Sequence, residues 1–493
     1  MCHWPSNPLI YEINTWVWLH DLSLQEKRTV TLSSVPSKVW DELADLKFNA
    51  IWFMGVWERS PAGIAISNHH SGNLADFHKA LPDFTPEDNV GSPYCVRRFV
   101  VDEHLGGPEG LAIARQELAN RGINLILDFV PNHLAHDHPW VTEHPEFFIQ
   151  GTEEDLKRDP ITFVKVGNAI FACGKDPFFP AWQDVLQVNA FNGGLRNAIR
   201  ETILDIASQC DGLRCDMAML VMNDIFERTW GERAGTPQPK VYWTELIGAV
   251  KSVNLHFLFI AEAYWDLEWQ LQQQGFDFCY DKRLYDLLAQ GSTVNINLHL
   301  KADPLYQSKL VRFIENHDEP RVLSLFREER KKAAALVIAT LPGARLFHEG
   351  QLDGRIVKLP VFLRRRPWEV TKPEIRDFYK RVFEVVSRPI FHSGTWRLCD
   401  CLGWTDNSSF QNLLAWSWKI ENEFLLIVVN YCGNESQGKV RLPYEELEGL
   451  QWRLDDSLSG EQYNRDGDEM TGPGLYVGLK PWGFHFFRIY QIR

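Results

Sequence analysis

Three acidic residues of this 493-residue chain are associated with short apolar runs. Asp216 ends the run DGLRCD, Glu262 ends FLFIAE, and Asp318 lies in FIENHDEP. Three carboxylates would suit a site that needs a nucleophile, a general acid/base and a group that stabilises positive charge. Hydrolysis of a glycoside with retention of configuration requires the first two, with their carboxyl groups about 5 to 5.5 Å apart. Our hypothesis for these residues is therefore chemistry at the anomeric carbon of a sugar.

The surroundings of two of these acids differ in the way that such a reaction requires. Arg214 stands two residues before Asp216, so both side chains share one face of an expected strand and the cation can keep the carboxylate ionised. Glu262 follows an apolar run and precedes the residues AYW, and less polar surroundings raise the pKa of a carboxyl group. A single aspartate at a strand end is more often a turn or helix-cap residue, so the argument depends on the whole set.

The apolar runs before these acids are typical of strands that are buried on both faces. Eight runs have this pattern: residues 9–14, 49–57, 124–130, 211–216, 257–262, 276–281, 310–316 and 344–349. Helices are expected between them, for example over 36–47 and 108–121, because apolar residues recur there every three to four positions. This alternation predicts a parallel sheet. In a (β/α)8 barrel the carboxyl ends of the strands line one face, which would bring the three acids together.

Two parts of the chain interrupt this alternation, and a third part ends it. Residues 58–105 are rich in Gly, Pro, Asn and His without a clear period, which predicts a long loop of the kind that is usually functional. Residues 134–183 predict a small subdomain inserted after the third strand. Beyond about Pro389, short apolar or alternating runs predict an antiparallel β-sandwich. The expected domains are a catalytic barrel over 1–388, which contains the insert, and an all-β domain over 389–493.

Composition excludes several classes of partner. The net charge of −14 and the pI of about 5.6 disfavour nucleic acid and anionic membranes, because both need a basic surface. No run approaches the roughly 18 apolar residues of a membrane span. Nine scattered cysteines, an odd number, indicate free thiols in a reducing compartment, and the N-terminus lacks the pattern of a signal peptide. We expect a cytoplasmic protein that needs no disulfide.

Four stretches of the chain resemble, in the same order, the four signature regions of the α-amylase family of glycoside hydrolases. They are DFVPNH (128–133), GLRCDMA (212–218), IAEAYW (260–265) and ENHDEP (315–320). The resemblance covers nearly the whole chain, and four motifs together are far more specific than any one of them. It implies an eight-stranded barrel, a subdomain inserted after strand three and a C-terminal β-domain.

The resemblance also implies roles for individual residues. Asp216 matches the family nucleophile, Glu262 the general acid/base and Asp318 the residue that stabilises the transition state. The residues implied to bind the sugar are Tyr94, His133, Arg214 and His317. Asp128 resembles a family aspartate with a structural role.

Several residues depart from the family pattern. The Lys-His pair that follows the nucleophile in many true α-amylases is absent after Asp216, which argues against specificity for long glucans. Gln187 occupies the place of a frequent aspartate in a fifth short region. Asn132 resembles a family calcium ligand, but Ca²⁺ takes six to eight oxygen ligands and the other carboxylates are not evident. We predict no catalytic metal and no cofactor, and the sequence leaves a structural calcium ion open.

The leading hypothesis is a retaining glycosidase or transglycosylase that acts on α-glucosidic bonds of a small oligosaccharide or glucoside. A sugar phosphorylase or a glucosyltransferase on the same scaffold would differ only in the acceptor, and Arg97, Arg98 and Arg321 are candidate cations for phosphate. A non-catalytic carbohydrate-binding or interaction protein should have lost at least one of the three acids, and all three are present. The sequence leaves the sugar, the linkage, the acceptor and the oligomeric state open.

Overall fold

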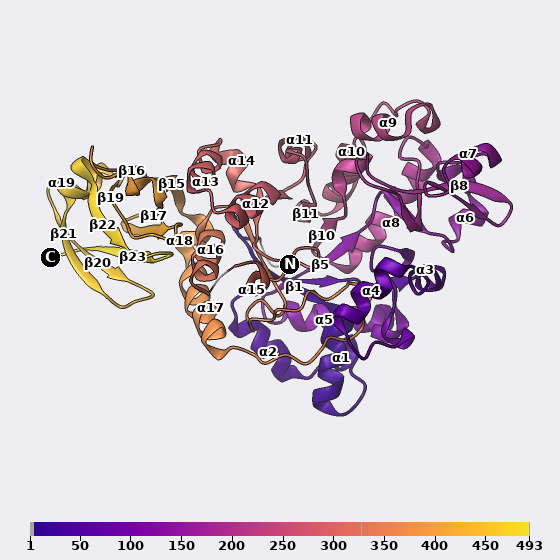
Figure 1. Cartoon of the computed structure of the whole chain (residues 1–493), viewed down its shortest axis with the longest axis horizontal. Coiled ribbons are helices and arrows are strands. Elements are labelled where there is room, and N and C mark those ends of the chain that lie inside the picture. Colours follow the sequence, from indigo (N-terminus) through magenta and orange to yellow (C-terminus); the bar gives the residue numbers. More distant parts are fainter. Residues whose placement is uncertain (1–3, 327, 493) are drawn as a thin grey trace.

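A closed barrel of eight parallel strands forms the centre of the computed structural model, which describes residues 4–326 and 328–492 (Figure 1). The strands are β1 (Leu9–Asn14), β2 (Ala50–Met54), β5 (Asn124–Phe129), β10 (Gly212–Cys215), β11 (Leu258–Ala261), β12 (Phe278–Tyr280), β13 (Leu310–Arg312) and β14 (Ala344–His348). They follow one another around the barrel in chain order, and β14 closes it by pairing with β1. The predicted barrel and its eight strands are confirmed.

Helices surround the barrel and connect its strands. Those between consecutive strands include α2 (Ser37–Asp45), α5 (Gly107–Ala119), α8 (Gly193–Gln209), α10 (Tyr242–Val253), α12 (Lys282–Gln290), α13 (Thr293–Leu300), α14 (Pro304–Ser308) and α16 (Glu328–Thr340). The two predicted helices correspond to α2 and α5. The apolar stripe of α5 is buried, and Gly122 just beyond it has a φ of +72°, a conformation that glycine adopts at little cost. No helix among residues 4–326 and 328–492 is long and apolar enough to cross a bilayer.

Three helices lie where the sequence predicted loop. After β1, the chain enters α1 (Thr15–Glu26) directly, and the Asn14 side chain accepts a hydrogen bond from the amide of Val17. The predicted loop 58–105 contains β3 (Trp57–Arg59), α3 (Pro61–Ser67), α4 (Ser71–Ala80) and β4 (Val96–Val101). Helix α1 was not expected because it opens with Thr, Trp and Val, which have modest helix propensity. Helix α3 was not expected because its opening Pro was counted as a loop residue, although proline is favoured in the first turn of a helix.

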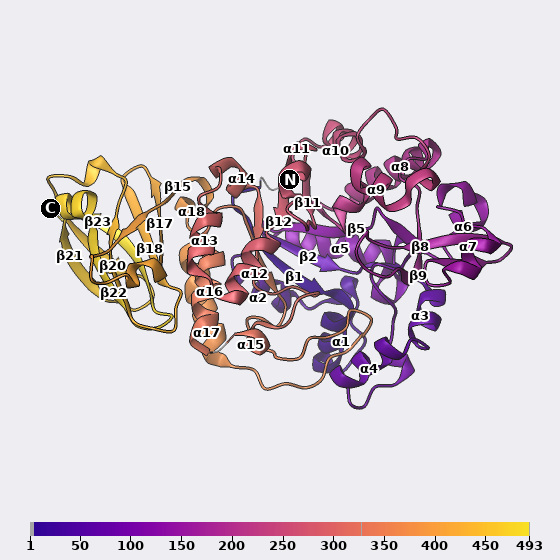
Figure 2. The same ribbon diagram turned by 45° about the horizontal axis from the view of Figure 1, so that its top comes forward.

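A four-stranded antiparallel sheet follows β5. Its strands, in spatial order, are β6 (His133–Ala135), β9 (Trp182–Gln187), β8 (Ala169–Gly174) and β7 (Phe163–Val166), with the short helices α6 (Trp140–Glu143) and α7 (Glu153–Arg158) between β6 and β7. Strand β9 extends to Gln187, beyond the predicted end of the insert. Figures 1 and 2 show this sheet at the opposite end of the molecule from the C-terminal domain.

The C-terminal domain consists of two antiparallel sheets and follows the helices α17 (Pro373–Val386) and α18 (Pro389–Ser393) (Figure 2). The larger sheet has the order β15 (Thr395–Leu398), β17 (Leu413–Ile420), β18 (Glu423–Asn430), β23 (Phe484–Gln491), β20 (Gln451–Asp456) and β21 (Gln462–Asp466). The smaller has the order β16 (Asp400–Leu402), β19 (Ser436–Arg441) and β22 (Leu475–Leu479). This confirms the predicted antiparallel β-domain.

Alternation along β17 explains how the larger sheet joins the barrel. Trp416 and Trp418 belong to the core shared with the barrel helices, whereas Leu413 and Ala415 face the core between the two sheets. The indole of Trp418 also donates a hydrogen bond of 2.8 Å to the carbonyl of Thr340 at the end of α16. The domain is therefore packed firmly against the barrel.

Candidate active site

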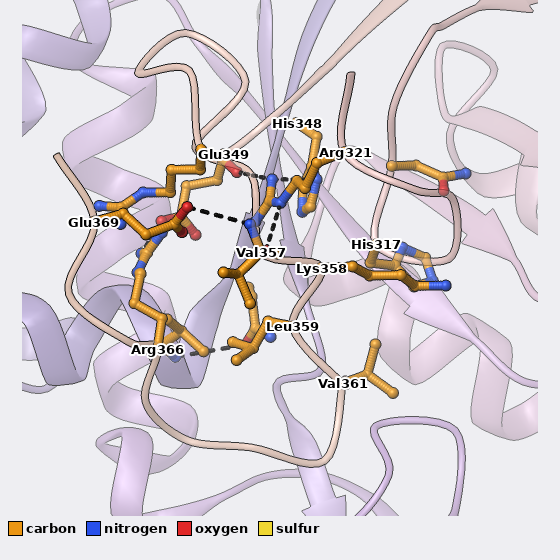
Figure 3. A pocket seen from close by; sticks show the side chains of 14 residues that line it. His317, Arg321, His348, Glu349, Val357, Lys358, Leu359, Val361, Arg366 and Glu369 are labelled. Atoms are coloured by element: carbon orange, nitrogen blue, oxygen red, sulfur yellow. Dashed lines mark hydrogen bonds and ion pairs between the residues drawn. The ribbon is translucent and has the colours of Figure 1, made fainter. Parts of the chain in front are cut away.

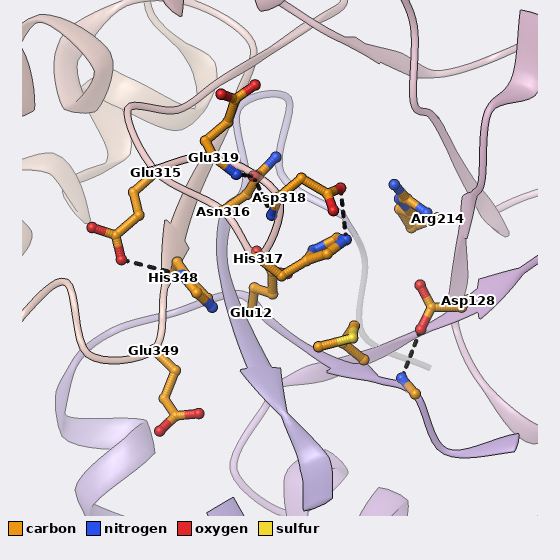
Figure 4. A network of polar contacts seen from close by, with 12 residues as sticks. Glu12, Asp128, Arg214, Glu315, Asn316, His317, Asp318, Glu319, His348 and Glu349 are labelled. Carbon is orange, nitrogen blue, oxygen red and sulfur yellow. Dashed lines mark hydrogen bonds and ion pairs between the residues drawn. The ribbon is translucent and has the colours of Figure 1, made fainter. Parts of the chain in front are cut away.

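The three predicted acids lie just beyond the carboxyl ends of their strands. Asp216 directly follows β10, Glu262 directly follows β11, and Asp318 lies in the loop after β13. These ends share one face of the barrel, because all eight strands are parallel. Figure 4 shows Asp318 facing Arg214 across the site. The structure therefore brings residues 102 positions apart in the chain into one cluster (from 216 to 318).

Arg214 joins two of the acids. Its Nη1 lies 2.7 Å from Oδ1 of Asp216, and its Nη2 lies 2.7 Å from Oε2 of Glu262. The guanidinium is only 1% exposed and is surrounded by the rings of Trp52, Tyr94 and Tyr280, with centroids 5.1 to 5.7 Å away. Two carboxylates on one planar cation are compatible with the close separation that a retaining glycosidase needs, about 5 to 5.5 Å.

Glu262 has the surroundings of a carboxyl group that holds a proton near neutral pH. Burial raises its pKa to about 7, while Arg214 opposes the rise and Asp216 adds to it. Its Oε2 accepts a 2.6 Å hydrogen bond from the amide of Met217, and its Oε1 accepts one of 2.9 Å from the hydroxyl of Tyr264. Met217 has a φ of +41°, an unusual value for a residue with a side chain, and this backbone orients the amide that reaches Glu262. The sequence prediction of a raised pKa agrees with this geometry.

Asp216 and Asp318 differ from Glu262 and from each other. Burial raises the pKa of Asp216 above its ordinary value, and the charge and hydrogen bond of Arg214 oppose that rise. Asp318 is partly desolvated, but His317 outweighs this effect and holds the pKa of that carboxyl well below its usual range. The side chain of Asp318 is 44% exposed, so it is the most accessible of the three acids. The site thus offers two buried carboxyl groups with raised pKa values and one exposed carboxyl group with a lowered pKa.

His317 organises the side of the site around Asp318. Its Nε2 lies 2.9 Å from Oδ2 of Asp318 and 2.7 Å from the hydroxyl of Tyr94, whose ring stacks on the imidazole. Its Nδ1 contacts the carboxylate of Glu12, a residue of β1 that the sequence prediction missed. The only signal for Glu12 in the sequence is an acid inside the apolar run LIYEIN. Of the predicted binding residues, Tyr94, Arg214 and His317 therefore meet at the acids.

His133 lies behind Tyr94. Burial lowers the pKa of His133 to about 4, with a smaller opposing effect from the main chain of Tyr94, so the ring is neutral at pH 7. Its ring packs against Trp182 of β9, with centroids 5.3 Å apart. Within residues 4–326 and 328–492, no hydrogen bond joins His133 to Asp216, Glu262 or Asp318. The structure places it near the main chain of Tyr94.

Asp128 ties two barrel strands together under the site. Its Oδ2 accepts a 2.8 Å hydrogen bond from the amide of Gly55, just after β2. Burial raises the pKa of Asp128 to about 6, and Arg214 opposes that rise. This agrees with the structural role that the sequence motif implies for Asp128.

A small pocket lies beside His317 (Figure 3). The segment after β14, between residues 349 and 369, lines this pocket. Arg321 donates hydrogen bonds to the carbonyl oxygens of Glu349 and Val357, and Lys358 donates one to the carbonyl of Asp318. Arg366 forms ion pairs with Glu349 and with Asp21 of α1. Three basic residues therefore hold this segment against the active-site face, which restricts the room for substrate on the side of β1 and β14.

The residues around Asn132 do not fit calcium. The Gln187 side-chain amide donates hydrogen bonds of 2.8 Å to the carbonyl of Asn132 and 2.9 Å to its Oδ1, so both oxygens already accept from a neutral donor. Calcium needs several free oxygen ligands at one point. In the described part of the chain, no group of three or more His, Cys, Asp or Glu is arranged to hold a metal ion. Gln187, which stands where the family often has aspartate, thus takes up the lone pairs that a cation would use.

We predict that neither chelation nor reduction changes the stability of the protein. The eight cysteines in the described residues are free thiols, and most are buried. With EDTA or with dithiothreitol, Tm is expected to change by less than about 1 °C, whereas losing a bound structural ion or a disulfide would cost several degrees. Differential scanning calorimetry with and without each reagent tests this, with added CaCl₂ as the control. A fall of several degrees with EDTA that CaCl₂ reverses would contradict the prediction.

The fold and the site together define the class. A closed (β/α)8 barrel, a sheet inserted after its third strand and three acids at the strand ends are the architecture of a glycoside hydrolase. The family model described as "Alpha amylase, catalytic domain" matches residues 32–358. The chain belongs to the α-amylase family.

Individual relatives are distant. The chain is 24% identical to the α-amylase MalA of Haloarcula japonica over 371 residues. This aligned region covers 71% of this chain and 45% of the relative. It is 24% identical over 250 residues to the intracellular maltogenic amylase of Bacillus subtilis, which covers 48% of this chain and 39% of the relative. It therefore spans less than half the length of both. Among solved structures, the noncanonic maltogenic α-amylase AmyB from Thermotoga neapolitana superimposes with a TM-score of 0.71 at 18% identity, with 99% of each chain covered, which supports the fold.

Proposed function

We propose that this protein is a retaining glycoside hydrolase or transglycosylase that acts on α-glucosidic bonds of small oligosaccharides or glucosides. The observation that carries the proposal is the Arg214 guanidinium, which holds Asp216 and Glu262 together while Glu262 keeps a pKa of about 7. A nucleophile and a proton donor on one cation are the two groups that a double displacement needs. Membership of the α-amylase family supports the same conclusion.

In the first step, the carboxylate of Asp216 attacks the anomeric carbon while Glu262 gives its proton to the leaving glycosidic oxygen. The bond to the leaving group breaks, and a glycosyl ester with Asp216 forms. In the second step, Glu262, now ionised, removes a proton from water or from a sugar hydroxyl, which attacks the same carbon and releases Asp216. The two inversions restore the α configuration.

The remaining residues act on charge and position. Asp318, kept ionised beside His317, faces the positive charge that develops on the sugar ring in the transition state. Tyr94 offers its ring to the sugar, and His317 and Arg214 hold Tyr94 and the acids in position. His133 supports Tyr94 from behind. No metal or other cofactor takes part in this proposal, because these residues supply each proton and each charge.

Hydrolysis or transfer to a sugar is favoured over phosphorolysis. Arg97 and Arg98 both pair with Glu58, and Arg321 pairs with Glu315. Each cation considered for phosphate thus already has an anionic partner, and an incoming phosphate would have to compete with it. A non-catalytic binding protein is also disfavoured, since it would have no need for a carboxyl group with a pKa of about 7 that shares one arginine with a second buried acid.

Three further points belong to this proposal. A small substrate is favoured because the basic segment after β14 narrows one side of the site. A cytoplasmic location is favoured because the relative from Bacillus subtilis is named as intracellular and the described cysteines are free thiols. The acidic net charge of −14 supports a neutral sugar, not nucleic acid or a membrane, as the partner. The oligomeric state is left open.

The test is product analysis on a panel of maltooligosaccharides, isomaltose, sucrose and trehalose, with and without inorganic phosphate. We expect at least one α-glucoside to be cleaved, the first-formed product to be the α anomer by NMR, and phosphate to leave the product unchanged. A β anomer would mean an inverting site, in which Asp216 is not a nucleophile. A sugar phosphate among the products would instead show a phosphorylase.

A further inference from the structure

Glu12 is a buried acid next to the candidate site, and no catalytic step above uses it. It lies on β1, whose six residues are all buried, and its side chain is 0% exposed. Its strand neighbours in the barrel are Trp52 on β2 and His348 on β14. An unpaired carboxylate at such a place costs several kcal/mol by desolvation, about the net stability of a small domain. The buried carboxylate of Glu12 therefore needs a partner for its charge inside the barrel.

That partner is His317. Oε1 of Glu12 contacts Nδ1 of the imidazole, while Oε2 has no hydrogen-bond partner among the described residues. The other ring nitrogen, Nε2, faces Oδ2 of Asp318 at 2.9 Å. A neutral imidazole has only one N–H, so it can donate to only one of two carboxylates. Carboxylates at both nitrogens therefore require a proton on each, which makes the ring an imidazolium.

Charged and titratable groups reach His317 from every element packed against it. They are Glu12 from β1, Tyr94 from the loop before β4, Asp128 from β5, Arg214 from β10, Asp318 from its own loop and Lys358 from the segment after β14. The carboxylates at 12 and 318 and the hydroxyl of Tyr94 touch the ring nitrogens directly. Burial alone would lower the pKa of His317, but Asp318 and Glu12 outweigh it and raise the pKa well above its ordinary value.

We propose that Glu12 is a positioning residue that keeps His317 as an imidazolium, with the ring oriented so that it holds Asp318 and Tyr94 at the sugar. The function of this contact rests on the glycosidase function proposed above. Without Glu12, the Nδ1 proton loses its acceptor, and Asp318 alone must keep the ring charged. At neutral pH a neutral ring would present one donor instead of two, and Asp318 would lose the positive charge beside it.

The first measurement needs no activity. In protein labelled with ¹⁵N-histidine, the ring nitrogens of His317, assigned by their loss in His317→Asn, report its charge directly. We expect the wild-type ring to remain charged from pH 6 to pH 8.5. In Glu12→Gln the midpoint of its titration is expected to move down by about 1 to 3 pH units, while Glu12→Asp keeps most of the charge. A wild-type His317 that titrates near its ordinary value of about 6.5 overturns the proposal.

The second measurement is kinetic. At pH 8.5, where the wild-type ring is still charged, we expect Glu12→Gln to lower kcat on the best substrate in step with the neutral fraction of His317, and Glu12→Asp to recover most of the loss. Asp281→Asn, which removes the carboxylate from another buried acid–histidine pair (Asp281 and His299, 3.0 Å apart), controls for a general loss of stability. If Glu12→Gln folds with an unchanged His317 titration and unchanged kcat, Glu12 is not a positioning residue.

These two measurements separate the possible failures. If no α-glucoside is turned over but His317 titrates as expected, the proposed function is wrong and the Glu12 contact stands. If turnover is found and His317 is neutral at pH 7 in the wild type, the glycosidase proposal stands and the role of Glu12 fails. Should Glu12→Gln not fold, the wild-type titration and Glu12→Asp still decide the question.

Discussion

Asp216→Asn is expected to lower kcat on every α-glucoside by at least about 10⁴-fold, the scale of losing a covalent nucleophile. The amide of asparagine is uncharged and cannot form the glycosyl ester at a useful rate. Arg214 would keep its second partner, Glu262, so the site should remain folded. Mass spectrometry of acid-quenched enzyme checks the reason for the loss: the wild type with a slow activated glycoside should show a mass increase of one glycosyl unit, and Asp216→Asn should show none.

Asp211→Asn is the matched control for this variant. Asp211 lies at the opposite end of the same strand, where its carboxylate accepts hydrogen bonds from Arg115 and from the amide of Leu125. At the amino ends of barrel strands a side chain contributes to stability, not to chemistry. We expect Asp211→Asn to reduce stability by about 1 kcal/mol and to keep kcat within about twofold. Covalent labelling that survives in Asp216→Asn would show that another residue is the nucleophile.

Glu262→Gln is expected to separate substrates by their leaving groups. Natural glucosides need a proton on the departing oxygen, so their kcat should fall by about 10² to 10⁴-fold. Glucosyl fluoride or a nitrophenyl glucoside departs without that proton, so the first step should survive and the glycosyl-enzyme should accumulate. Rapid-quench kinetics on both kinds of substrate measures the difference. An equal loss on all substrates would mean that Glu262 is not the proton donor.

The pH profile gives an independent measure of Glu262. The protonated carboxyl group is the active form in the first step, so kcat/KM of the wild type should fall as the pH rises through about 7, the pKa of Glu262. The acid side depends on ionised Asp216, whose pKa is raised by burial, so that limb should lie above the ordinary aspartate value. In Glu262→Gln the alkaline limb should disappear.

Glu268→Gln is the control for this profile. Glu268 is also buried, and its pKa is likewise raised to about 7 by burial, but it lies at the start of α11 (Glu268–Gln273) near Asp281 and away from Arg214. Its substitution should leave the alkaline limb in place. If the alkaline limb disappears in Glu268→Gln but persists in Glu262→Gln, Glu268 and not Glu262 is the group that titrates near pH 7 in catalysis.

The sequence alone determined the barrel and the positions of its acids. Burial on both faces of parallel strands produces unbroken apolar runs, so β10 and β11 could be recognised along with the acids that end them. Parallel strands expose their carboxyl ends on one face, and from that rule the meeting of Asp216, Glu262 and Asp318 could be predicted. The helices α1, α3 and α4 were missed, since their Trp-, Pro- and Gly-containing segments become helical through tertiary packing and caps more than through periodicity.

Only the tertiary structure decided which charges are paired. Glu12 and His317 are 305 residues apart and meet because β1 closes the barrel near the loop after β13. In the same way, Glu58 pairs with Arg97 and Arg98, and Gln187 reaches the oxygens of Asn132. Local sequence patterns indicate whether a residue is buried, because buried positions recur with the period of the strand or helix. The identity of a partner across the barrel has no such period, so the pairing of these groups can be read only from the folded chain.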